Sequence, residues 1–334
     1  MDWLTALLAD PFLGKPTWVW LVFLAVVAIL LTLDLGVLHR RRREIGVTES
    51  LFLSLGYMTV GVAFGAWVWW GMGSEAGINY LTGFAIEKSL ALDNIFVISL
   101  IFTFFAIPRQ YQHRVLFWGI LGVIVLRGVM IGLGAALVEQ FAWTLWIFGG
   151  FLVITGLKML VVTNHDTADL ADNAVLGFLR RHLRVTDGLR DHHFFVRAPD
   201  AQGRLVWWTT PLFLCLVLVE LADIVFAVDS VPAIFAITTD PYIVYTSNIF
   251  AILGLRALYF ALAAMMHRFV YLKYALALIL VFIGGKIFWA QAFGKPDPAL
   301  SLAVTLGLIA GGIAVSLWKT RMATTAVPEK SAAE

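Results

Sequence analysis

Acidic side chains stand inside two apolar stretches of the chain. Glu87 precedes Asp93 by six residues in GFAIEKSLALDNIFVISL, and Asp223 precedes Asp229 by six residues in VELADIVFAVDSVPA. With a further acid in a third apolar run, the candidate metal ligands are Glu87, Asp93, Asn94, Glu220, Asp223, Asp229, Ser230 and Asp34. They offer oxygen atoms, which suit hard divalent cations such as Mn²⁺, Mg²⁺ or Ca²⁺ better than Cu⁺ or Zn²⁺. Asp34 is a further ligand or marks the mouth of a path.

The acids of the two stretches are expected to face the interior of a helix bundle. Five carboxylates facing lipid would cost about 12 to 18 kcal/mol on insertion scales. A six-residue spacing turns about 240° on a regular helix, so the members of each pair do not share a face. Either the helix unwinds locally, for which Pro232 is a candidate, or the two positions serve different depths of a path. Acids that converge need a cation or protons among them.

Basic side chains in the same apolar runs are the expected charge partners of the acids. They are Lys88, Arg127, Lys158, Arg256 and Lys286. One interpretation is that paired charges hold helices together. A second is that the bases occupy empty carboxylates and are displaced when an ion binds. A third, an oxyanion held by the bases, is opposed by repulsion from the carboxylates.

The composition predicts an all-α polytopic membrane protein. Of 334 residues, 60% are hydrophobic and 14% charged, and the mean hydropathy is +0.86. The net charge of +2 does not suggest a nucleic-acid partner. Runs of about 20 apolar residues predict nine spans, near 17–38, 51–72, 78–105, 115–138, 142–162, 210–236, 243–266, 273–293 and 300–318.

Lysine and arginine alternate between the predicted connections. They are frequent in every second connection and rare in the others, which predicts an outside N-terminus and a cytoplasmic C-terminus in a bacterial inner membrane. The expected organisation is one membrane domain at 1–320, a cytoplasmic loop at 163–208 and a disordered tail at 321–334. Within the loop, FLRRHLRV predicts a short helix and FFVRAPDAQGRLVWW predicts a hairpin. The loop histidines, His165, His182, His192 and His193, lack a fixed spacing, which favours a solvated loop over a metal site.

An internal repeat relates the two acidic stretches. The spans after the first stretch carry GILGVIVLR and LVITGLK, and those after the second carry AILGLR and LVFIGGK. Repeat A at 78–162 and repeat B at 210–293 hold three spans each, so the copies insert with opposite orientation. Inverted repeats of this kind are typical of transporters with a site near the bilayer midplane.

The two acidic motifs resemble those of the TerC family of integral membrane proteins. EKSLALDNIFV at 87–97 and VELADIVFAVDSVPAIFAIT at 219–238 carry the resemblance, together with FLRRHL and FFVR between them. It implies Mn²⁺ efflux, and for some members a role in supplying metal to exported enzymes or in membrane-protein assembly. It also implies that Glu87, Asp93, Glu220, Asp223 and Asp229 handle the metal.

We therefore expect a divalent-cation exporter that works by alternating access and ion or proton exchange, with Mn²⁺ as substrate and no permanent cofactor. No phosphate-binding loop or nucleophile constellation indicates an enzyme. The alternatives are an assembly or metalation factor and a tellurite (oxyanion) transporter. Expected partners are the divalent ion and the lipid bilayer, with a homo-oligomer or membrane-protein partner left open. Replacing Asp93 or Asp229 by Asn is expected to abolish transport without preventing insertion.

Overall fold

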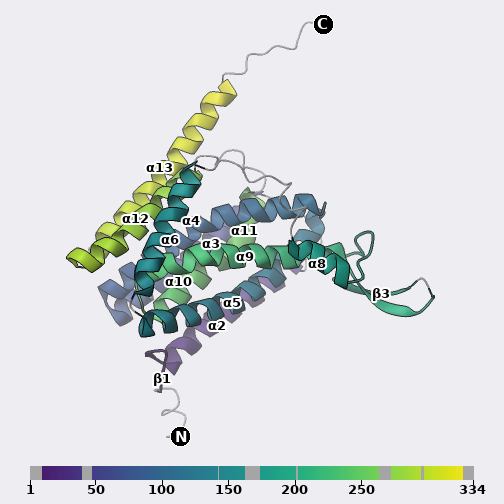
Figure 1. The fold of residues 1–334 in the computed structure, drawn as a ribbon, viewed down its shortest axis with the longest axis horizontal. Helices are drawn as coiled ribbons and strands as arrows, with labels where there is room; N and C mark the ends of the chain where they lie inside the picture. The colour runs from purple at the N-terminus through teal and green to yellow at the C-terminus, as the bar shows by residue number, and fades with distance from the viewer. Residues whose placement is uncertain are drawn as a thin grey trace.

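The computed structural model describes residues 10–39, 47–141, 143–161, 174–200, 202–262, 272–294 and 297–325. Within these ranges the side chains of a few residues, Asp34 and Asp93 among them, lie outside the description. The chain folds as a bundle of long helices, with two short hairpins at its ends (Figure 1). The helices are α2 (Thr17–His39), α3 (Val47–Met72), α4 (Ser74–Phe104), α5 (Arg109–Gln140), α6 (Thr144–Val161), α8 (Ala174–His182), α9 (Pro211–Phe235), α10 (Pro241–Leu253), α11 (Leu255–Leu262), α12 (Leu272–Phe293) and α13 (Pro298–Thr325).

Seven described helices are long and apolar enough to cross a membrane, with α10 and α11 forming one of them. They coincide with seven of the nine predicted spans. The other two predictions fall on α2, whose described apolar run Thr17–Leu33 is shorter, and on α4, which carries four charged residues. An all-α membrane fold is therefore confirmed, and the count of nine remains a prediction for α2 and α4.

The break in the membrane helices is not where the sequence suggested. Local unwinding near Pro232 was one expectation, yet α9 continues through this residue to Phe235, and α4 is uninterrupted. Pro232 stands in the last turn, so its missing amide disturbs only the end of the helix. The interruption lies one span later, at Gly254 between α10 and α11.

Two groups of helices surround the core. α4, α5 and α9 run beside one another, and α6, α12 and α13 lie inclined to them (Figure 1). α5 packs on α9, α10 packs on α4, and α6 packs along α12. The last pair approaches closely because Gly149 and Gly284 face each other: a Cβ on Gly284 would lie 2.7 Å from the Gly149 carbonyl oxygen.

The ends of the bundle carry the non-helical structure. The strands β1 (Pro11–Phe12) and β2 (Lys15–Pro16) pair near the start of α10, where Lys15 forms an ion pair with Asp240. At the other end, α8 precedes an antiparallel hairpin of β3 (Phe195–Pro199) and β4 (Leu205–Thr209), which projects from the bundle (Figure 1). α8 and the hairpin lie where the sequence predicted a helix and a hairpin.

The C-terminal helix is longer than expected. α13 continues to Thr325, so the first five residues of the predicted disordered tail, 321–325, are helical. Residues 326–334 and His165 lie outside the described chain.

Candidate functional site

A fully buried arginine joins the two acidic stretches. Arg127 of α5 forms ion pairs with Glu87 of α4 and with Asp223 of α9, where Nη2 and Oδ1 are 3.2 Å apart. Arg127 and Glu87 are 0% exposed. The sequence predicted that Arg127 pairs with these acids, and the structure shows which two it meets.

Two polar side chains close the network around Arg127. Its Nη1 donates to Asn248 Oδ1 at 2.8 Å and to Ser230 Oγ at 3.0 Å. Asn248 Nδ2 in turn donates to the other oxygen of Glu87 at 3.0 Å. Four helices, α4, α5, α9 and α10, therefore meet at one buried guanidinium.

The network lies near the middle of α9, which is a candidate membrane span, and of α4, which is a predicted one. At 1.5 Å per residue, Glu87 is about 20 Å from the first residue of α4 and Asp223 about 18 Å from the first residue of α9. A bilayer hydrocarbon core is about 30 Å thick. When all three groups are ionised, Arg127, Glu87 and Asp223 have a net charge of −1. The cluster therefore still favours an added cation.

Helix geometry explains which predicted residues join the network. On α9, Asp223 and Ser230 are seven residues apart, which returns the chain to the same face, and both contact Arg127. Asp229 lies on another face, where its neighbours are the Thr155 hydroxyl and the Lys158 ammonium of α6. The six-residue spacing thus places Asp223 and Asp229 apart, as expected for helices that do not unwind.

Glu220 lies one turn before Asp223 without joining the Arg127 network. Its Oε2 is buried and has no hydrogen-bond partner among the described residues. The carboxylate occupies the space above Gly122 of α5, so closely that a Cβ there would meet Oε1 at 2.0 Å. Only glycine at 122 lets this carboxylate lie against α5.

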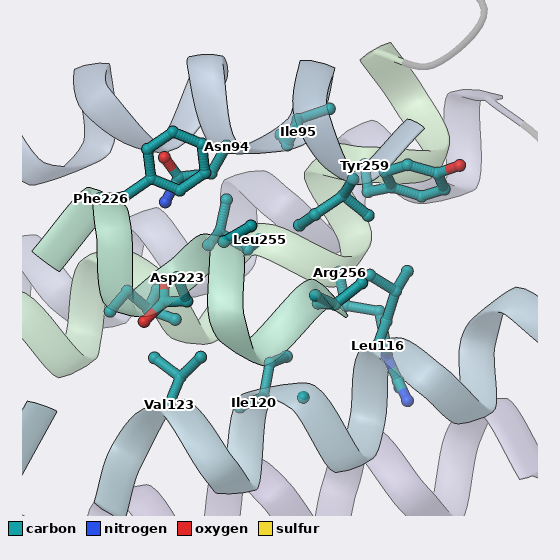
Figure 2. A pocket seen from close by; sticks show the side chains of 15 residues that line it. Asn94, Ile95, Leu116, Ile120, Val123, Asp223, Phe226, Leu255, Arg256 and Tyr259 are labelled. Atoms are coloured by element: carbon teal, nitrogen blue, oxygen red, sulfur yellow. The ribbon is translucent and has the colours of Figure 1, made fainter. Parts of the chain in front are cut away.

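A narrow cavity adjoins Asp223 (Figure 2). It has a volume of about 30 Å³, enough for a water molecule. Asn94 and Asp223 lie on one side of it and Tyr259 and Arg256 on the other, between apolar side chains such as Phe226. Asn94 is 3% exposed, and neither its amide nitrogen nor its amide oxygen has a hydrogen-bond partner in the described part of the chain.

The other predicted charge partners have different surroundings. Arg256 is buried in the cavity wall, and its nitrogen end points away from Asp223 (Figure 2). Lys88 donates to a backbone carbonyl of α10, and it forms no ion pair with any carboxylate whose side chain is described. Lys158 is exposed and adjoins Asp229, and Lys286 is half-buried in α12.

Convergence of the acids, one of the two arrangements that the sequence left open, is not found among the described side chains. No group of three or more His, Cys, Asp or Glu side chains in the described part of the chain is placed to hold a metal ion. Glu87 and Asp223 meet through Arg127, while Glu220 and Asp229 lie apart from it. The side chains of Asp93 and Asp34 lie outside the description.

Asn248 is the network member that the sequence analysis missed. It follows Thr246 and Ser247, and all three are 0% exposed. Three consecutive polar residues in the middle of an apolar span were the available signal, since such side chains face a bundle interior. Asn94 and Ser230 each directly follow an acid, whereas Asn248 has no charged neighbour in the sequence that would mark it.

Comparison with known proteins identifies the family. The model of the family described as "Integral membrane protein TerC family" matches residues 72–324, more than half of the chain. The chain belongs to the TerC family. The matched residues include the whole Arg127 network and the cavity, so the resemblance drawn from the two acidic motifs is confirmed.

Relatives of this TerC-family protein match along nearly their whole length. "Uncharacterized membrane protein STKORF319" of Myxococcus xanthus is 46% identical over 94% of this chain and 96% of its own. An "Uncharacterized membrane protein" of Rickettsia bellii is 48% identical over 89% and 96%. "Putative membrane-bound redox modulator Alx" of Escherichia coli K12 is 46% identical over 91% and 95%. No solved structure matches.

Proposed function

We propose that this TerC-family protein exports a divalent metal cation, Mn²⁺ in the first place, across the bacterial inner membrane. The observation that carries the proposal is the buried guanidinium shared by Glu87 and Asp223. If Arg127 leaves, two buried carboxylates remain with two negative charges, which one divalent cation neutralises. Ser230 and Asn248 then offer further oxygen ligands of the kind that Mn²⁺ accepts.

The surroundings of the network support entry of the cation from the cytoplasm. The cavity lies on the side of the network where α4 ends and where α5 and α9 begin, which is the predicted cytoplasmic side. On the opposite side, apolar residues of three helices pack together: Ile131 of α5, Val231, Ile234 and Phe235 of α9, and Val244 of α10. This arrangement suits a state that is closed toward the outside.

Alternating access is the transport mechanism that we propose. Arg127 occupies the carboxylates in the absence of the ion, the ion displaces it, and exchange against protons or another ion resets the site. Packing supports the inverted repeat on which this rests: α5 of repeat A packs on α9 of repeat B, and α10 of repeat B packs on α4 of repeat A. In the nine-span arrangement the N-terminus is outside and the C-terminus cytoplasmic.

Two other activities receive less support. An oxyanion would need an accessible guanidinium, and Arg127 is enclosed by two carboxylates. The name of the Escherichia coli relative contains the words redox modulator. In this chain the one cysteine, Cys215, is buried and cannot form a disulfide within the chain.

The proposal is tested by Mn²⁺ flux into proteoliposomes holding the purified protein, with an imposed pH gradient as the variable. Glu87→Gln and Asp223→Asn keep the shape of the side chains and remove charge from the network, so we expect both to abolish flux. Glu139→Gln, at an exposed position of α5, is the matched control. No flux from the folded wild-type protein, or normal flux in both network variants, would overturn the assignment.

A role in membrane-protein assembly is the second candidate, and the projecting hairpin favours it. Leu205 is 74% and Trp207 60% exposed on one face of the β3–β4 pair. Arg197 lies over the Trp207 ring at 4.7 Å on the same face. Such a face could receive an apolar segment of another protein.

A further inference from the structure

The span formed by α10 and α11 is interrupted in the membrane interior. α10 ends at Leu253, Gly254 separates the helices, and α11 begins at Leu255. In an unbroken helix the Ala251 carbonyl would accept a hydrogen bond from the amide of Leu255. The last carbonyls of a helix lack such partners, and in the membrane no solvent replaces them.

Lys88 of α4 lies at this break. Its Nζ donates to the Ala251 carbonyl oxygen at 3.0 Å. It also lies 2.9 Å from the position that a Cβ on Gly254 would take, so the ammonium sits directly against the interruption. A cation at a helix C-terminus is favoured by the helix dipole and can satisfy its terminal carbonyls.

The residue before Lys88 contacts the same helix. Glu87 accepts from Asn248 Nδ2, and Asn248 lies three residues before Ala251 on one face of α10. Two neighbouring residues of α4 therefore hold α10 at two points, one at the Arg127 network and one at the break. A shift of α10 at the break would therefore also displace Asn248 in the Arg127 network, and the reverse.

We propose that Lys88 is a positioning residue whose ammonium replaces the missing backbone donor at the break and thereby fixes Asn248 in the Arg127 network. In transporters with discontinuous helices, the C-terminal end of a half-helix coordinates a coupling cation. In this chain the positive charge at the end of α10 is the Lys88 ammonium, a side chain of α4. The part of the inference that concerns transport rests on the proposed function.

Amide hydrogen exchange on the purified full-length protein tests the structural part. We expect Lys88→Met, which has no donor, to raise exchange in peptides covering residues 251–258 by about tenfold, which corresponds to about 1.4 kcal/mol. Lys88→Arg keeps a charged donor and is expected to restore slow exchange. If the methionine variant is not recovered in folded form, Lys88→Gln, a shorter neutral donor, is expected to give an intermediate rate.

The matched control removes a lysine of β2 that contacts the other end of the same span. Lys15→Met breaks the ion pair with Asp240, whose Nζ–Oδ2 distance is 2.8 Å, and should leave exchange at 251–258 unchanged. Exchange in Lys88→Met or Lys88→Gln equal to the wild type would overturn the inference. So would an equal rise in Lys15→Met.

Transport gives a readout that a purely structural role would not move. We expect Lys88→Met to lower the maximal Mn²⁺ flux about tenfold with little change in the Mn²⁺ concentration for half-maximal flux, and Lys88→Arg to recover it. Absence of flux in the wild type would overturn the proposed function and leave the exchange result standing. Wild-type exchange in the lysine variants would overturn only the role of Lys88.

Discussion

At the scale of single residues, the chemistry of this protein depends on one guanidinium shared by carboxylates from two helices. A pair of buried charges is a weak source of stability, but removing one partner leaves the other uncompensated. Arg127 therefore serves both interpretations drawn from the sequence, helix cohesion and occupation of an empty ion site. The two interpretations make different predictions for a variant that lacks Arg127: only an ion site would bind an added cation there.

Replacing Arg127 separates these two interpretations. Arg127→Met should destabilise the protein by about 3 to 5 kcal/mol, because Glu87 and Asp223 lose their partner. If the carboxylates form an ion site, added Mn²⁺ should raise the melting temperature of this variant more than that of the wild type, measured in detergent. A loss of stability that Mn²⁺ does not reverse would support helix cohesion alone.

Gly122 gives a second test at this scale, directed at Glu220. Gly122→Ala places a methyl group 2.0 Å from the present position of Glu220 Oε1 and must displace the carboxylate. We expect Mn²⁺ flux to fall about tenfold. Gly132→Ala on the same helix meets nothing within 4 Å and should transport normally. Equal flux in the two variants would remove Glu220 from the path.

At the scale of elements, the sequence predicted well which segments are helical. It predicted less well where a helix is interrupted. Long apolar runs mark helices because a membrane admits few other spanning structures. Pro232 and Gly254 are both potential helix breakers, and only the second ends a helix. Pro232 stands in the last turn of α9, where its missing amide has little effect. At Gly254, Lys88 satisfies the exposed carbonyl end, and such a tertiary contact cannot be read from local sequence.

The sequence predicted most of the residues in the Arg127 network, but not which of them pair with one another. Glu87, Asp223, Arg127 and Ser230 were all named from the sequence, because charge in an apolar run must face inward. Their arrangement around a single arginine depends on four helices meeting, which residue spacing does not specify. The same limit explains why Asp229 was grouped with them although it contacts α6.

The α6–α12 pair allows a prediction about helix packing. A Cβ on Gly284 would lie 2.7 Å from the Gly149 carbonyl oxygen and 2.8 Å from Val153 Cγ2, so Gly284→Ala must push the helices apart. We expect a loss of stability of about 1 to 3 kcal/mol, measured by thermal unfolding in detergent. Gly285→Ala, whose Cβ meets nothing within 4 Å, should unfold like the wild type.

At the scale of the whole molecule, the hairpin decides between the two candidate functions. Replacing both exposed residues, Leu205→Ser together with Trp207→Ser, leaves the Arg127 network untouched. A transporter should keep its Mn²⁺ flux in proteoliposomes and its protection of cells against Mn²⁺. An assembly factor should instead change the levels of other membrane proteins in the double variant, with or without added metal.

The burial of the α10–α11 span has a consequence for how the chain is made. Its apolar window is 83% buried within the protein, against 17 to 44% for the six other candidate spans. Lipid therefore cannot substitute for its protein neighbours. Among the described helices, those with the most extensive packing on α10, other than the adjoining α11, are α2, α3, α4, α5 and α9, and all precede it in the chain. During synthesis from the N-terminus, the polar Asn248 thus reaches the membrane after the helices that will enclose it have been made.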